Sequence, residues 1–166
     1  RGRVFTGRPS SGPGESGDTA RYALREHCRT LAMVRLIVDG MNVIGSRGDG
    51  WWEDRDAAVI RLIRMIAEAE ALGGEEVTVV LDGRLPPGLG KTTRAGIAVI
   101  ESRRRGRNAA DHRIVELLAD DPRPWEVTVI TSDRALRDRV RSLGAKVIGS
   151  GSFLRLLDGR SRGPGQ

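Results

Sequence analysis

The chain has 166 residues, a hydrophobic fraction of 39% and a net charge of +6, which suits one globular domain. Its single cysteine, Cys28, excludes an intramolecular disulfide framework and a multi-cysteine zinc site, and its two histidines, His27 and His112, lack ligand spacing. No apolar run reaches transmembrane length and no segment has a signal-peptide pattern, so we expect a soluble cytoplasmic protein.

In chain order, residues 1–32 are expected to be a disordered, basic N-terminal segment, with six arginines against three acids. Met33 directly precedes the first expected strand, so it is a candidate start codon, and residues 1–32 are then candidate non-native sequence. The folded domain is expected over residues 33–158, followed by a flexible tail over residues 159–166.

Strands and helices alternate through the body of the chain. We expect, in order, a strand at about 34–39, a helix at 52–72, strands at 76–81 and 97–100, a helix from 108, a strand at 126–131, a helix ending at 143, a strand at 145–148 and a helical turn at 153–157. This alternation predicts an α/β three-layer fold, with a mostly parallel sheet and helices on both faces.

Three of the apolar strands end at an aspartate, namely Asp39, Asp82 and Asp133. The carboxyl ends of parallel strands meet at the ligand-binding edge of an open sheet, and Asp111 lies in the first turn of an expected helix. Taken singly, Asp82 reads as a turn residue, Asp133 as an N-cap and Asp111 as a partner of the helix dipole. Gathered together, four carboxylates repel one another, and only a cation or a protonated partner relieves that repulsion.

Hard carboxylate oxygens suit Mg²⁺ or Mn²⁺, and such ions favour attack of metal-activated water on a phosphodiester. A basic run directly upstream of Asp111 suits a phosphate backbone, with a solvated loop as the alternative. The run consists of Arg103, Arg104, Arg105 and Arg107.

Two further features have both a functional and a structural interpretation. The segment 88–93 resembles a phosphate-binding loop, but Leu85 stands where that motif requires glycine, which argues against an NTPase. Lys91 and Arg94 remain candidate phosphate contacts, against the alternative of a solvated loop. Trp51 and the tryptophan after it are candidates for base stacking or for a hydrophobic staple at the helix entry, with one of the two favoured as the staple.

The motifs, taken in order, resemble those of NYN domains, a branch of the PIN-like nucleases, and most closely the YacP-like bacterial proteins. The resemblance covers roughly residues 34–157. It rests on the D-G-x-N segment 39–42, the strand ending at Asp82, the segment 108–111 and the segment 131–133.

The resemblance implies a Rossmann-like PIN fold, a divalent-metal site and cleavage of single-stranded RNA. It makes Asp39, Asp111 and Asp133 the expected metal ligands and Asp82 a less secure fourth member. Asn42 would orient the substrate or the Asp39 side chain, and capping of the turn is its structural alternative.

The family includes a ribosome-associated endoribonuclease, so ribosome-associated mRNA is a candidate substrate. The chain lacks the longer C-terminal helical part of some relatives, which bears on ribosome association and not on the chemistry. We therefore expect a metal-dependent endoribonuclease. The alternatives are a non-catalytic RNA-binding protein on the same fold and a regulatory or toxin-like module that acts through a protein partner.

Overall fold

A computed structural model describes residues 35–69, 72, 75–93, 95–102, 106 and 108–159. The expected N-terminal segment 1–32, and all but the first residue of the expected tail, lie outside the described residues. Among the described residues, no helix is long and apolar enough to cross a membrane.

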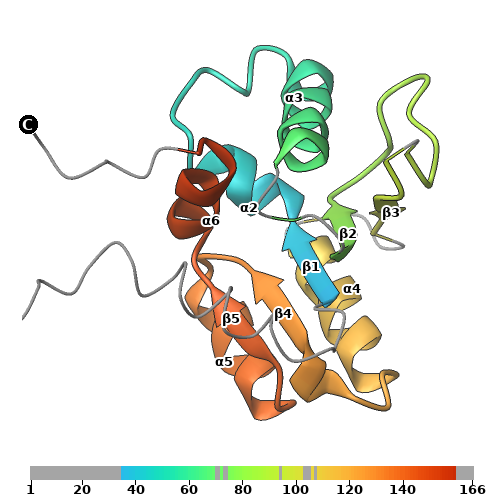
Figure 1. Cartoon of the computed structure of the whole chain (residues 1–166), viewed down its shortest axis with the longest axis vertical. Coiled ribbons are helices and arrows are strands. Elements are labelled where there is room, and N and C mark those ends of the chain that lie inside the picture. Colours follow the sequence, from blue (N-terminus) through green and yellow to red (C-terminus); the bar gives the residue numbers. More distant parts are fainter. Residues whose placement is uncertain are drawn as a thin grey trace, which may run out of the picture.

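Five parallel strands form one sheet, in the order β3-β2-β1-β4-β5 (Figure 1). The strands are β1 (Arg35–Asp39), β2 (Glu76–Leu81), β3 (Ala98–Glu101), β4 (Val127–Ile130) and β5 (Lys146–Ile148). The helices are α2 (Gly40–Gly45), α3 (Arg55–Glu68), α4 (Ala109–Ala119), α5 (Arg134–Ser142) and α6 (Ser150–Leu157), with a 3₁₀ turn η2 (Pro124–Glu126). This confirms the predicted α/β fold.

The sheet separates two apolar clusters, as expected for strands that are buried on both faces. On one face Leu36 and Val38 of β1 pack in a cluster with α2, α3 and Phe153 of α6. On the other face Ile37 packs in a cluster with buried residues of α4 and α5. In Figure 1, α2, α3 and α6 lie in the upper half of the molecule and α4 and α5 in the lower half.

Two expected elements differ from the structure: the long helix expected at 52–72 spans only Arg55–Glu68, and the segment after β1 is helical. The long helix expected at 52–72 begins at Arg55, because the Asp54 side chain accepts a hydrogen bond from the Ala57 amide (2.9 Å) and caps it. The segment after β1, expected as a turn leading into a loop, is the short helix α2, whose Val43 and Ile44 are fully buried.

The glycine of the D-G-x-N segment is explained by close packing. A Cβ atom on Gly40 would lie 2.6 Å from Cδ2 of Leu81 and 3.1 Å from the carbonyl oxygen of Val80. Both distances are shorter than ordinary van der Waals contacts, so α2 can start against β2 only because residue 40 has no side chain.

Candidate active site

The strand order brings the predicted carboxylates to one edge of the sheet. Asp39 ends β1, the central strand, and the neighbouring strands β2 and β4 lead directly to Asp82 and to the segment that ends at Asp133. Asp111 lies in the first turn of α4, which packs against β1 and β2. All four predicted residues therefore belong to elements that meet at this edge.

Asp39 is the most buried of these carboxylates, with 4% of its surface exposed. Its Oδ1 accepts a hydrogen bond from the backbone amide of Asn42 (3.3 Å), and its Oδ2 accepts one from the Thr131 hydroxyl (3.0 Å). Burial, and after it the negative charges of Asp111 and Asp82, raise the pKa of Asp39 to about 7, against the lowering effect of these two hydrogen bonds.

Asp111 is half-buried, and its pKa is also raised, first by burial and then by the negative charges of Asp133 and Asp82. The positive charges of Arg139 and His112 act in the opposite direction. The carboxylates thus lie close enough to raise one another's pKa, and a shared cation would relieve this repulsion between negative charges.

None of the four aspartates makes an ion pair with a described residue. As the side chains stand, no three His, Cys, Asp or Glu residues in the described part of the chain are grouped closely enough to hold one metal ion. The donor set nonetheless fits a hard divalent cation in kind, because it consists of carboxylate oxygens without cationic partners. Rotation of these side chains toward a common point would be part of binding.

Asp82 and Asp133 also cap helices. Oδ1 of Asp133 accepts a hydrogen bond from the Leu136 amide (2.8 Å) and caps α5, which confirms the N-cap interpretation of this residue. Oδ1 of Asp82, which directly follows β2, accepts a hydrogen bond from the Ala110 amide (2.6 Å) and so caps α4 from a distant part of the chain. Asn108, at the N-cap position of α4, has φ of 68° and makes no capping bond with its side chain.

Asn42 joins three elements at the same edge. Its carboxamide oxygen accepts hydrogen bonds from the Ser132 amide (2.8 Å) and the Ser150 hydroxyl (2.7 Å), and the Ser132 hydroxyl accepts one from the Ser150 amide (2.9 Å). The predicted role in orienting Asp39 corresponds to the Asn42 backbone amide, while its side-chain oxygen ties α2 to the end of β4 and the start of α6. That oxygen is therefore already engaged by protein donors.

Thr131, Ser132 and Ser150 were not predicted as site residues. Thr131 is fully buried, and its hydroxyl donates to Asp39 while accepting from the Asp133 amide (3.1 Å). The sequence signal for Thr131 and Ser132 was the family-like segment 131–133, which was used for its aspartate, and a hydroxyl pair before an aspartate is also the common pattern of an ordinary N-cap segment.

The two tryptophans have different environments. Trp51, predicted to contact RNA, packs against the apolar cluster that contains Val43 and Ile44. Trp52 is 65% exposed, and its ring meets Trp51 edge to face, with 6.3 Å between centroids. Trp52 therefore has the more exposed ring, and contact of either tryptophan with RNA stays a prediction.

The predicted RNA contacts outside this edge are placed only in part. Lys91 is exposed on the loop before β3, where its carbonyl oxygen accepts a hydrogen bond from the Val99 amide (2.7 Å). The remaining predicted contacts lie outside the described residues, namely Arg94, Arg103, Arg104, Arg105 and Arg107.

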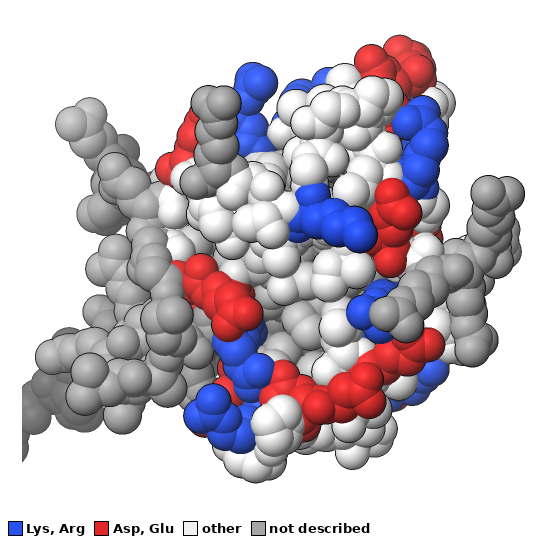
Figure 2. Space-filling view, turned by 90° about the vertical axis from the view of Figure 1, so that its right-hand side faces the viewer, with Lys and Arg blue, Asp and Glu red and all other residues white. Residues whose placement is uncertain are grey.

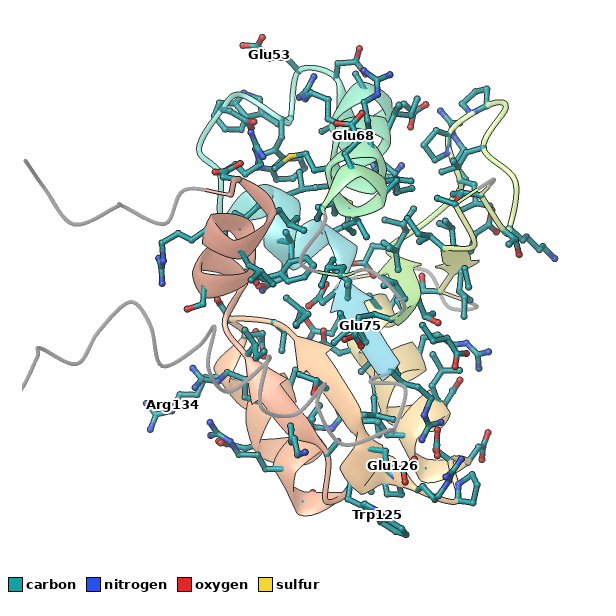
Figure 3. All side chains as sticks on the ribbon, viewed as in Figure 1. Glu53, Glu68, Glu75, Trp125, Glu126 and Arg134 are labelled. Atoms are coloured by element: carbon teal, nitrogen blue, oxygen red, sulfur yellow. The ribbon has the colours of Figure 1, made fainter. Side chains whose placement is uncertain are left out.

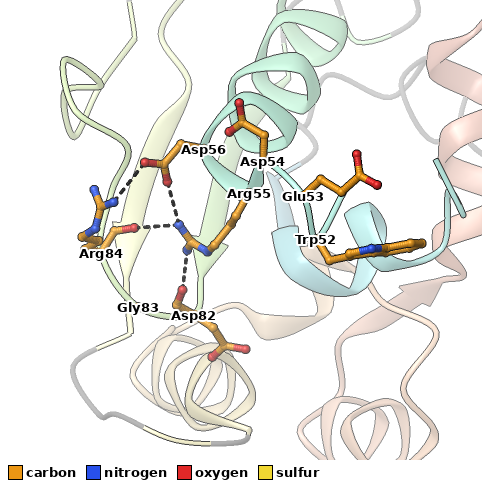
Figure 4. Close-up of a pocket in the computed structure, with 8 residues that line it drawn as sticks. All are labelled: Trp52, Glu53, Asp54, Arg55, Asp56, Asp82, Gly83 and Arg84. Atoms are coloured by element: carbon orange, nitrogen blue, oxygen red, sulfur yellow. Dashed lines mark hydrogen bonds and ion pairs between the residues drawn. The ribbon is translucent and has the colours of Figure 1, made fainter. Parts of the chain in front are cut away.

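A shallow hollow of about 450 Å³ lies beside Asp82 (Figure 4). Arg55 donates hydrogen bonds to the carbonyl oxygens of Asp82 and Arg84 (3.2 Å to Arg84), and Arg84 forms an ion pair with Asp56 (3.1 Å). The Asp82 side chain points away from the Arg55 guanidinium (Figure 4). The lining contains four acids and two arginines, so its charge does not favour a phosphate. The lining residues are Trp52, Glu53, Asp54, Arg55, Asp56, Asp82, Gly83 and Arg84.

Comparison with known proteins agrees with this architecture. The sequence model of the YacP-like NYN domain matches residues 36–163. A crystal structure of Rae1 (YacP) from Bacillus subtilis is similar, with a TM-score of 0.56 and 30% identity over 75% of this chain and 73% of that chain. The crystal structure of a tryptophan-to-leucine mutant of the same Bacillus subtilis protein gives a TM-score of 0.58 and 25% identity over 76% of each chain. No curated protein sequence matches the chain.

The family match covers most of the chain and overlaps every strand of the sheet. It agrees with the resemblance in the motifs and with the all-parallel sheet flanked by helices. Membership points to a nuclease or another RNA-related function. The chain belongs to the family of YacP-like NYN domains.

Proposed function

We propose that the protein is a divalent-metal-dependent endoribonuclease that hydrolyses phosphodiester bonds of single-stranded RNA in the cytoplasm. The observation that carries the proposal is the set of four aspartates from β1, β2, β4 and α4 at one edge of the sheet, without an ion pair to any described residue. A structural role alone does not explain why Asp39 is buried there with its pKa raised to about 7.

Asp39, Asp111 and Asp133 would hold the Mg²⁺ or Mn²⁺ ion, and Asp82 would join them through Oδ2, since its Oδ1 accepts from Ala110. A bound ion would supply a water molecule of lowered pKa and neutralise charge on the scissile phosphate. Asp39 must be ionised to bind a cation. The Thr131 hydroxyl favours that form by donating to Oδ2.

The residues around the carboxylates would position them. The Asn42 amide and the Thr131 hydroxyl fix both oxygens of Asp39, one from each side. RNA would be held by exposed cations and by stacking of a base on Trp52. The cations proposed from the sequence are Lys91, Arg94, Arg103, Arg104, Arg105 and Arg107.

The test is cleavage of end-labelled single-stranded RNA in Mg²⁺ or Mn²⁺ and in excess chelator, with double-stranded RNA and DNA of the same sequence alongside. We expect metal-dependent internal cleavage of the single-stranded RNA, and its loss by at least about 100-fold in Asp39→Asn, since the chemistry depends on the bound ion. Asp120→Asn is the matched control, because Asp120 is exposed at the far end of the helix that carries Asp111.

Cleavage that persists in chelator, or in Asp39→Asn, would contradict the proposed metal site. Binding of RNA without cleavage under every metal condition would instead support a non-catalytic RNA-binding protein on the same fold. A protein partner that co-purifies and masks the acidic edge would favour the regulatory alternative.

A further inference from the structure

Helix α5 carries an unusual excess of positive charge. Its nine residues contain four arginines and one aspartate, whereas none of the other described helices exceeds a net charge of +1. The side of the molecule at β3 carries both signs, with acidic side chains along its lower border (Figure 2). The charge of α5 is therefore a local feature and not a sample of the general surface.

Three of these arginines form a stripe along one side of α5, with Arg134 and Arg141 exposed and Arg137 half-buried. Leu136 and Val140 are fully buried and mark the inner face of the helix. Arg134, Arg137 and Arg141 are spaced i, i+3 and i+7, so they share one side of the helix and span about 10 Å along its axis. Figure 3 shows Arg134 extending from α5 away from the body of the molecule.

The first two members of the stripe have no ion pair with a described residue. Asp138, the only acid of the helix, lies 3.9 Å from Arg141, and no acidic side chain among the described residues pairs with Arg134 or Arg137. Most other arginines of the described sequence do form ion pairs, namely Arg35, Arg47, Arg55, Arg84, Arg113 and Arg123.

Helix stability does not explain the charge at the start of α5. Cations stabilise the C-terminal end of a helix dipole and are disfavoured at its N-terminal end. Arg139 and Arg141 lie in the last turn, where their charge also complements the helix dipole. Arg134 is the first residue of the helix, so its position is unfavourable for the helix and calls for another reason.

The stripe begins at the carboxylate edge. Arg134 directly follows Asp133, and α5 then runs from that edge along the outside of the sheet (Figure 1). An extended strand of RNA with one phosphate at the carboxylates would present its next phosphates within reach of this face. A span of about 10 Å accommodates about two phosphates.

We propose that Arg134, Arg137 and Arg141 bind the phosphate backbone of the RNA strand on one side of the scissile phosphate, a role that rests on the proposed nuclease function. The guanidinium groups would pair with phosphate oxygens, a geometry that suits arginine. Because such contacts do not read bases, the stripe would add affinity and register, and sequence preference would come from elsewhere.

The test compares two double variants that remove the same charge at the same spacing. Arg134→Gln with Arg137→Gln changes the stripe. Arg61→Gln with Arg64→Gln is the control, since both side chains are exposed on α3 and have no ion pair with a described residue. Binding of fluorescent single-stranded RNA is measured in chelator, to prevent cleavage, from about 50 to about 500 mM salt.

We expect the stripe variant to lose two phosphate contacts. Its plot of log affinity against log salt should be flatter by about 1.4, which corresponds to affinity about 25-fold weaker at about 0.1 M salt if the lines meet at about 1 M. The control variant should match the wild type in affinity and slope. In cleavage assays the stripe variant should show a raised KM with kcat nearly unchanged.

The proposed RNA-binding role of the stripe would be wrong if the wild type and the stripe variant showed equal affinity and parallel salt lines. If the wild type still cleaved RNA, the proposed function would stand. A fall in kcat at unchanged KM would also overturn it, because it would assign Arg134 to the placement of Asp133. If the wild type neither binds nor cleaves RNA, the proposed function itself fails, and the stripe with it.

Discussion

Replacing Asp39 with asparagine should stabilise the folded protein at neutral and alkaline pH in the absence of metal. The pKa of Asp39 is raised from its ordinary 3.8 to about 7, chiefly by burial. Each pH unit corresponds to about 1.4 kcal/mol, so ionising Asp39 inside the fold costs about 4 kcal/mol relative to the unfolded chain. Asparagine is nearly isosteric with the protonated acid and does not ionise, so Asp39→Asn avoids this cost.

The sign of the pH dependence follows from the direction of the shift. Between about pH 4 and pH 7 the folded protein keeps the Asp39 proton while the unfolded chain releases it, so wild-type stability falls as pH rises. The contribution of Asp39 to the free energy of unfolding is fully present below the pKa of the unfolded chain and is lost once the pH passes about 7. The stability difference between Asp39→Asn and the wild type should therefore grow by about 1.4 kcal/mol per pH unit and then level off.

The assay is urea denaturation of both proteins in chelator from about pH 4.5 to about pH 8.5, because other titrating groups largely cancel in the difference. A second series with Mg²⁺ or Mn²⁺ should stabilise the wild type according to its affinity for the ion, and Asp39→Asn much less. A difference that does not vary with pH, or a variant less stable than the wild type at about pH 8, would refute the account of Asp39 as a buried carboxylate held for a cation.

Two further substitutions test how the edge is built. Asp82→Asn keeps an oxygen that can accept a hydrogen bond from the Ala110 amide, so it should change the free energy of unfolding by less than about 0.5 kcal/mol. Asp82→Ala removes the cap and should lower the free energy of unfolding by about 1 kcal/mol. Equal urea midpoints for the two variants would contradict the capping role. Gly40→Ala should lower the free energy of unfolding by about 1–3 kcal/mol, since the new Cβ would collide with the fully buried Leu81. An unchanged thermal midpoint would show that Leu81 can move aside without cost.

Most of the fold could be predicted from the sequence, because its strands are continuous apolar runs with clear ends. The strand 76–81 was predicted to the residue, and the end of helix α5 within one residue. Helix α2 was missed because its six residues include two glycines and no local helix signal. Its start depends on a cap from Asp39 and on burial of Val43 and Ile44, both of which require the rest of the fold.

The candidate site was predictable in its acidic residues and not in their supports. An aspartate at the end of an apolar strand is visible in the sequence, and this pattern identified Asp39, Asp82 and Asp133. Asp111 was identified from its place in the first turn of an expected helix. The non-local bonds were not, because nothing in the sequence relates Asp82 to Ala110, 28 residues away, or Thr131 to Asp39, 92 residues away. Whether the carboxylates hold a metal ion remains a prediction.

The order of the strands explains why the site lies where it does. The chain proceeds from β1 outward through β2 to β3, and then returns to place β4 on the other side of β1. In open α/β sheets, this reversal leaves a crevice at the carboxyl ends of the two strands between which the order changes, here β1 and β4. Asp39 and Asp133 follow those two strands, and the Thr131 hydroxyl links them across the crevice. The same reversal starts α5 beside the carboxylates, so one topological feature would place both the proposed metal ligands and the arginine stripe along a single proposed path for the RNA strand.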